Sequence, residues 1–224
     1  MSLRNNYPVI LAIETGTPVC SVALQIRSGF VDELSAIGTG VHSEKTFQFI
    51  QALLEKYEYT IQNISKILIN NGPGSYTGLR IGASAAKGLL FDQKCQLYAV
   101  QSLASIAMGM IYRIPEIKTI HSVINARRTH LYHQQFVVAN NRLEAKTESA
   151  VLHLDEISVM CKPGDVIAGT GTNRLVGMVE CAKIFETDQA VSAKSMIELF
   201  NADYKEQFVS KVNPVNFEPL YQLD

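Results

Sequence analysis

The 224-residue sequence has few cysteines, little charge and no long apolar run. The cysteines stand at positions 20, 95, 161 and 181 without a Cys-x-x-Cys pair, which indicates neither a structural zinc site nor a disulfide framework. Free thiols in a reducing cytoplasm are the simplest interpretation. The apolar run at residues 9–13 stops at Glu14 and is too short for a signal peptide. No run approaches the ~18 residues that a membrane span needs.

An excess of charge of one sign is also missing. Lysine and arginine total 20 against 21 aspartates and glutamates, so the net charge is −1, while 47% of residues are hydrophobic. The chain is too apolar to be disordered. Phosphate binding needs clustered lysine and arginine, so the balance of charge gives the chain no reason to hold nucleic acid alone. The length fits one large domain or two small ones.

The order of predicted elements repeats along the chain. The first copy has strands at 9–13, 20–26 and 30–37, a helix at 43–57, a strand at 66–70, a helix at 78–91 and a strand at 97–100. After a helix at 102–112, the second copy has strands at 119–124, 131–138 and 143–147, a helix at 155–160, a strand at 166–168, a helix at 173–179 and a strand at 183–186. A helix from 192 to about 204 follows, and Ser43, Asp155 and Ser192 are the expected N-caps.

Both copies read βββαβαβ, which predicts an α/β protein with domains at 1–105 and 106–205. We expect the tail at 206–224 to pack back on the first domain. Glu14 and Asn125 end matching strands of the two copies, and the repeat places both at one cleft between the halves.

Residues 71–82 form the most specific stretch, a loop between a predicted strand and a predicted helix. A helix N-terminus there suits an anion, but the loop lacks the Lys-Ser/Thr pair of a Walker A motif. Compared with the Gly-x-Gly-x-x-Gly fingerprint of dinucleotide-binding loops, the third glycine of this stretch falls one residue late. Pro73 also removes an N–H that a phosphate would use. The residues that build this structural motif are Gly72, Pro73, Gly74, Ser75, Thr77 and Arg80.

Three glycines, Gly78, Gly82 and Gly88, lie inside the predicted helix that follows this loop. Each costs roughly 1 kcal/mol relative to alanine. Close approach by another backbone is the usual reason for such a cost. That backbone belongs either to the same chain or to a partner, and the sequence favours neither.

The histidines form no recognisable metal or catalytic motif. His42 has Thr46, not histidine, four residues later, so the helical pair that binds metals is missing. His130 and His133 are three apart on a predicted strand and therefore face opposite sides of the sheet. His121 and His153 stand alone, and no Ser-His-Asp or Cys-His signature is present.

Two stretches resemble the TsaB (YeaZ) family, which is related to the glycoprotease-family protein TsaD. Residues 10–24 resemble the opening hairpin of that family, and residues 71–82 match its Gly-Pro-Gly-Ser-Tyr-Thr-Gly-Leu-Arg-Ile-Gly signature almost letter for letter. Looser matches are His42 and residues 124–128, 131–132, 169–171 and 218–221. The resemblance covers essentially the whole chain and is most specific before residue 105.

The resemblance implies two duplicated RNase-H-like halves of the actin, hexokinase and Hsp70 (ASKHA) type, the second reduced. It implies a non-catalytic scaffold that works with the transferase TsaD and the ATPase TsaE. Together they install threonylcarbamoyl on the adenosine next to the anticodon of tRNA. The chain then reaches tRNA only through the complex and needs no membrane. The resemblance also allows a homodimer.

The same resemblance implies a partner and self-dimer surface on the helices at about 43–57 and 78–91. The residues that it assigns there are Phe47, Ile50, Gln51, Leu54, Gly78, Leu79, Gly82, Ala83 and Ala86.

Departures from the related enzymes concern the cleft, where the resemblance places Glu14, Thr15 and Asn125 as a degenerate nucleotide site. ATPases and sugar kinases of this fold carry an acid in each hairpin, whereas the second is the neutral Asn125 here. One carboxylate holds Mg²⁺ poorly because a hard cation prefers anionic oxygen. ATP or ADP is then at most a weak, vestigial ligand, and we assign this chain no catalytic or metal-binding residue.

Two other functions remain as alternatives. The first is a nucleotide-binding ATPase or kinase-like enzyme of the actin-like fold, which would place Glu14, Thr15 and Arg80 near phosphate. The second is a metal-dependent peptidase, which the older glycoprotease label suggests. It lacks the His-x-x-x-His pair, because Thr46 stands where the partner of His42 is needed.

Overall fold

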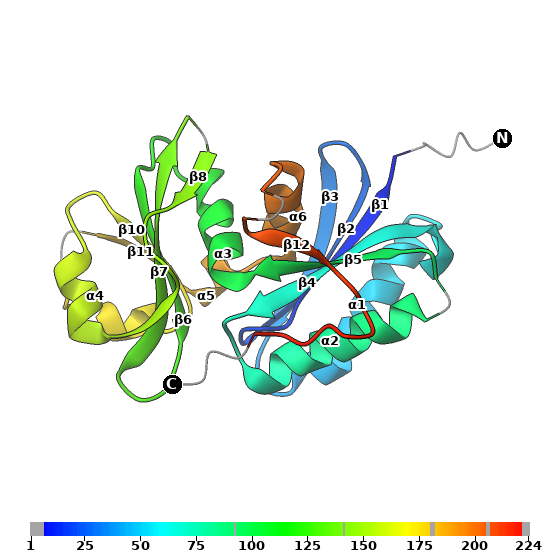
Figure 1. Ribbon diagram of the computed structural model, residues 1–224, viewed down its shortest axis with the longest axis horizontal. Coiled ribbons are helices and arrows are strands. Elements are labelled where there is room, and N and C mark those ends of the chain that lie inside the picture. The colour runs from blue at the N-terminus through cyan, green and yellow to red at the C-terminus, as the bar shows by residue number, and fades with distance from the viewer. Residues whose placement is uncertain (1–6, 92, 141, 180–181, 205–206, 221–224) are drawn as a thin grey trace.

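The computed structural model describes residues 7–91, 93–140, 142–179, 182–204 and 207–220 and contains two six-stranded sheets, one in each half (Figure 1). Cys181 and Tyr221, which figured in the sequence interpretation, lie outside these ranges. The elements of the first half, in chain order, are β1 (Val9–Glu14), β2 (Val19–Arg27), β3 (Phe30–Ile37), α1 (Val41–Lys56), η1 (Ile61–Asn63), β4 (Ile64–Gly72), α2 (Tyr76–Leu90), β5 (Gln96–Gln101) and α3 (Ser102–Ile111).

The second half begins at β6 and ends with a return to the first. Its elements are β6 (Thr119–Asn125), β7 (His130–Ala139), β8 (Arg142–Ala145), β9 (Ala150–His153), α4 (Leu154–Met160), β10 (Val166–Gly169), η2 (Thr172–Leu175), β11 (Lys183–Phe185), α5 (Thr187–Ala190), α6 (Ala193–Asn201) and β12 (Val209–Val212).

The first sheet has the strand order β12-β5-β4-β1-β2-β3. β1 pairs antiparallel with β2 and parallel with β4, so the β1–β2 turn and the loop after β4 emerge at one edge. Every residue of β1 is buried because helices cover both faces of the sheet. α1 and α2 share a buried cluster with one face of β1, and α3 and α6 share another cluster with the opposite face.

The second sheet repeats this plan with the order β11-β10-β6-β7-β8, and β9 pairs with the other end of β7. β6 pairs antiparallel with β7 and parallel with β10, as β1 does with β2 and β4. The second half has shorter helices, with α4 and η2 in the places of α1 and α2 (Figure 1). The α/β class and the duplicated, reduced second half are therefore confirmed.

One buried core joins the two halves. It takes side chains from the first sheet, such as Ile10, and from the second, such as Phe136, with α3 and α6 between them (Figure 1). A polar contact reinforces this layer at the start of α6. Glu33 of β3 accepts hydrogen bonds from Ser21 Oγ at 2.5 Å and from Ser192 Oγ at 2.8 Å. The carboxylate thus lies at the positive end of α6 and links the helix to β2 and β3.

The sequence assigned two helix starts incorrectly. α1 begins at Val41 after Gly40, which has a φ of 75°, and Ser43 only donates to the Gly40 carbonyl from the first turn. α4 begins at Leu154, and its N-cap is His153, whose Nδ1 accepts from the N–H of Asp155 at 3.3 Å. In both cases a better-placed residue precedes the expected cap. The third expected cap is confirmed, since Ser192 Oγ accepts from the N–H of Lys194.

Four short elements were not predicted, namely η1, β9, α5 and β12. One predicted helix is wrong. Residues 173–179 form only the end of the 3₁₀ turn η2 and a following loop. β12 pairs with β5 at the edge of the first sheet, so the C-terminal segment returns to the first half. No helix within the described ranges is long and apolar enough to cross a membrane.

Candidate functional site

Glu14 ends β1 at the edge where the cleft was expected, but its side chain turns inward and is 2% exposed. Its Oε1 accepts from the N–H of Gly16 at 2.9 Å and from Thr17 Oγ1 at 3.4 Å, and its Oε2 accepts from Asn70 Nδ2 at 2.5 Å. Desolvation raises the pKa of this carboxyl to about 7, although the same hydrogen bonds act to lower it. Both oxygens are therefore occupied by groups of the chain itself.

Thr15 is also used internally. Its N–H donates to Asn70 Oδ1 at 3.1 Å, and its hydroxyl donates to the Gly78 carbonyl at 2.8 Å. Asn70 in turn donates to Ser102 Oγ at 3.3 Å. The turn after β1 is thereby tied to β4, α2 and α3 at once, and Thr15, which is buried, uses both its N–H and its hydroxyl within the chain.

Asn125 ends β6, the counterpart of β1, and is exposed. Its N–H donates to Thr170 Oγ1 at 2.7 Å. A magnesium nucleotide does not fit these residues, because the carboxylate of Glu14 is buried and engaged while the amide of Asn125 carries no charge. In the described ranges no three His, Cys, Asp or Glu residues are grouped so as to hold a metal ion.

The loop of residues 72–75 is shaped by contacts within the chain. The N–H of Ser75 donates to the Gly16 carbonyl at 2.7 Å, and a Cβ on Gly74 would overlap that same carbonyl. Ser75 is the N-cap of α2, with its Oγ accepting from the N–H of Gly78 at 3.2 Å. Gly72 has a φ of 104°, a conformation that favours glycine. Pro73 is buried in this loop, whereas Thr77 is exposed on the first turn of α2.

The helical glycines meet the β1–β2 turn, not a partner. A Cβ on Gly78 would overlap the Thr15 carbonyl oxygen, and one on Gly82 would lie 2.5 Å from Thr15 Oγ1. A Cβ on Gly88 would meet nothing within 4 Å. Contact within the chain therefore explains the first two glycines and leaves the third unexplained.

Of the nine residues expected at the partner surface, seven are buried within the chain itself. They are Ile50, Leu54, Gly78, Leu79, Gly82, Ala83 and Ala86. Only Phe47, with 53% of its surface exposed, and Gln51 are open to solvent. Any partner that docks here meets the outward rim of α1 and α2, while the buried seven pack within the chain itself.

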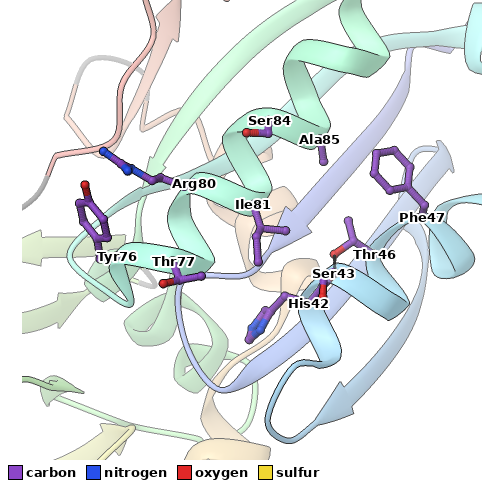
Figure 2. Close-up of a pocket in the computed structure, with 10 residues that line it drawn as sticks. All are labelled: His42, Ser43, Thr46, Phe47, Tyr76, Thr77, Arg80, Ile81, Ser84 and Ala85. Atoms are coloured by element: carbon purple, nitrogen blue, oxygen red, sulfur yellow. Dashed lines mark hydrogen bonds between the residues drawn. The ribbon is translucent and has the colours of Figure 1, made fainter.

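A hollow of about 520 Å³ lies between α1 and α2. Figure 2 shows Phe47 of α1 and Ile81 of α2 on its two sides, with Arg80 and Tyr76 on the side of α2 away from α1. The Arg80 guanidinium lies 4.0 Å from the centre of the Tyr76 ring. A second hollow of about 420 Å³ also includes Phe47, so this ring stands between the two. The resulting groove follows the seam of the two helices.

His42 lies at the start of α1, and its ring closes one end of this groove (Figure 2). Its Nε2 lies 2.7 Å from the Thr17 carbonyl oxygen and 3.2 Å from that of Val19, so as a donor it ties α1 to the β1–β2 turn. Thr46 donates to the His42 carbonyl at 2.6 Å. His42, one of the looser matches to the family, therefore has a structural role in this chain.

A buried histidine cluster in the second half was missed from the sequence. His121 Nδ1 lies 2.9 Å from His133 Nε2, and His121 Nε2 lies 3.2 Å from Asp165 Oδ2. Burial lowers the pKa of both rings, that of His133 to about 4, so both are neutral at pH 7. The expectation that His121 stands alone is wrong, and so is that for His153, whose ring centre lies 5.3 Å from that of His130.

Comparison with known proteins places these observations in a family. Residues 32–190 match the family model described as "TsaD: tRNA N6-adenosine threonylcarbamoyltransferase". The tRNA threonylcarbamoyladenosine biosynthesis protein TsaB of Escherichia coli is 28% identical over 154 residues, which are 69% of this chain and 62% of that protein. The protein of the same name from Bacillus subtilis is 32% identical over 135 residues, 60% of this chain and 58% of that one.

These matches span less than two thirds of the length of either curated relative. A solved structure, "YeaZ from Pseudomonas aeruginosa", extends the likeness of the fold to nearly the whole chain. It covers 96% of this chain and 100% of its own, with a TM-score of 0.80 at 22% identity. This similarity shows that the two chains share a fold.

Proposed function

The chain belongs to the TsaD family and to its TsaB (YeaZ) branch, and from this premise we propose that it is a non-catalytic scaffold subunit. It acts with a TsaD-like transferase and a TsaE-like ATPase in the cytoplasm. The complex installs threonylcarbamoyl on the adenosine next to the anticodon of tRNA. The net charge of −1 supports a chain that reaches tRNA through this complex and not by itself.

The state of Glu14 is the observation that carries the proposal. An actin-like enzyme needs a carboxylate that reaches magnesium and orients water. Here that side chain is 2% exposed, and its oxygens accept hydrogen bonds from Gly16 and Asn70. Freeing it would break these bonds, and Asn125 on the other half supplies no second charge. The cleft therefore supports a structural role.

The groove along α1 and α2 supports docking of the transferase. A protein of the same family has the same helix pair, so like faces can meet about an approximate two-fold axis. Phe47 at the centre and Tyr76 at one end are exposed aromatic side chains, the type that dominates binding energy at interfaces. A second copy of this chain would use the same face, so a homodimer and the complex with the transferase exclude each other.

Reconstitution tests the scaffold role directly. The transferase, the ATPase, tRNA and threonylcarbamoyl-adenylate are combined with and without this chain, and modified adenosine is quantified. We expect modification only in the complete mixture. Equal modification without the chain would contradict the proposal.

Calorimetric titration with Mg-ATP separates the scaffold from an actin-like enzyme. We expect no binding in the micromolar range for the isolated chain, because Glu14 cannot reach the metal without losing its own partners. Micromolar binding would favour the nucleotide-using enzyme. The transferase and the ATPase serve as controls, each titrated under the same conditions.

A further inference from the structure

The C-terminal segment at residues 213–220, called here the strap, leaves β12 and runs back across the first half to the loop between β4 and α2 (Figure 1). Phe217 anchors it, because this side chain is 6% exposed and belongs to the buried cluster that includes Ala83 and Leu90 of α2. Val215 and Leu220 on either side of this anchor are 81% and 64% exposed. The strap is therefore held by two buried side chains, Phe217 and Pro219, and by its backbone.

The backbone contact of the strap falls on the loop. The N–H of Leu220 donates to the Asn71 carbonyl at 2.8 Å. The Leu220 carbonyl oxygen occupies the space that a Cβ on Gly72 would need. The glycine that opens the family signature is thus required by the close approach of the strap as well as by its own positive φ.

The loop therefore lies between two supports. On one side the Gly16 carbonyl receives the N–H of Ser75, and on the other side Asn71 and Gly72 meet the strap. The loop determines where α2 begins, since Ser75 is its N-cap. The first turns of α2 carry Tyr76, which lines the hollow between α1 and α2. Only a few residues, from Asn71 to Tyr76, therefore separate the contact at Leu220 from the groove.

We propose that the strap is a positioning element for the docking face, which holds the first turn of α2 in the arrangement that the transferase binds. This inference rests on the proposed function, because it concerns the same groove. Without the strap, the loop loses its contacts with Leu220 and keeps those with the β1–β2 turn and, through Gly72, with Gln101 of β5. The start of α2 then samples more positions. Binding of the transferase has to restrict them again, and this entropic cost lowers the affinity.

A pair of substitutions at one position isolates the backbone contact. Leu220→Pro removes the N–H that bonds Asn71, whereas Leu220→Ala keeps it and shortens the same exposed side chain. In the Pro variant we expect amides of residues 74–79 to exchange hydrogen about three- to tenfold faster, the factor that one backbone hydrogen bond carries. Affinity for the transferase falls by a similar factor. The Ala variant matches the unaltered chain in exchange and affinity.

Gly72→Ala perturbs the same contact from the opposite side, because its Cβ displaces the Leu220 carbonyl; since its positive φ also strains an alanine, it is read only together with Leu220→Pro. We expect the same faster exchange at the start of α2, with β1 amides unchanged. Unchanged exchange in Leu220→Pro shows that the strap does not hold the loop. Faster exchange with unchanged affinity shows that the hold does not serve docking.

The two proposals fail in different ways. If the unaltered chain does not bind the transferase, the proposed function fails and this inference fails with it. If the unaltered chain binds and Leu220→Pro binds equally well, only the inference fails.

Discussion

Replacement of Phe47 by alanine tests the docking groove at its centre. The ring stands between the two hollows and is 53% exposed in the isolated chain. In the proposed complex the partner covers the exposed half. Substitution therefore removes a contact that exists only when the transferase is bound. It also removes the contacts of the buried half, and that loss affects the stability of the isolated chain.

The magnitude follows from the exposed area. A phenylalanine side chain offers roughly 200 Å², so about half of it, ~100 Å², is available to a partner. At ~25 cal/mol per Å² of apolar surface, its burial contributes about 2.5 kcal/mol. Loss of this amount weakens binding by about 70-fold. Alanine is also the best helix former, so α1 itself is not weakened by the change.

The assay is a calorimetric titration of the transferase with the unaltered chain and with Phe47→Ala. Val159→Ala is the control, because Val159 is an apolar residue of α4 that is 84% exposed on the second half. We expect the control to bind like the unaltered chain. Binding of Phe47→Ala within about twofold of the unaltered chain, or an equal loss in the control, would refute the assignment of the groove.

Two further predictions concern the fold. Gly82→Ala is expected to lower the free energy of unfolding by about 1–3 kcal/mol, since its Cβ would lie 2.5 Å from Thr15 Oγ1. Gly88→Ala, where the Cβ meets nothing within 4 Å, is expected to raise the free energy of unfolding by about 0.5–1 kcal/mol. Urea titration of both variants separates the effect of steric crowding from that of helix propensity. The His121–His133 pair predicts a loss of stability in acid. The folded-state pKa of His133 is about 4, against 6.5 for the free group, so the unfolded chain binds more protons between these two pH values. The stability that the neutral ring contributes is therefore complete above pH 6.5 and declines toward pH 4. His133→Gln keeps a hydrogen-bond donor for His121 without a titrating ring. We expect its free energy of unfolding, measured from pH 7 to pH 4, to depend less on pH than that of the unaltered chain. An equal pH dependence in both proteins would contradict the explanation.

Elements with local signals were predictable from the sequence. The structure places β3 at Phe30–Ile37, the predicted bounds, because the hairpin signal at residues 27–29 immediately precedes the strand. The start of α1 was missed because Gly40 adopts a positive φ, and a glycine N-cap gives a weaker signal than the serine three residues later. Short edge strands such as β12 were missed because their pairing is decided by distant segments.

The site was predictable only in outline. The sequence indicates that something approaches Gly78 and Gly82 closely, but the neighbour is Thr15, more than sixty residues away, and only the folded chain identifies it. The cluster of His121, His133 and Asp165 depends on the β6–β7 register and on a third segment 44 residues beyond His121. Neither is encoded in a local pattern.

The core that runs through both halves has a mechanical consequence. A two-domain protein that closes around a ligand needs a hinge or a sliding interface between its halves. Here α3 and α6 are buried between the sheets, so each 100 Å² of apolar surface exposed by opening would cost about 2.5 kcal/mol. In the proposed complex the molecule would therefore act as a stiff template, and any movement driven by ATP would belong to the proposed partners.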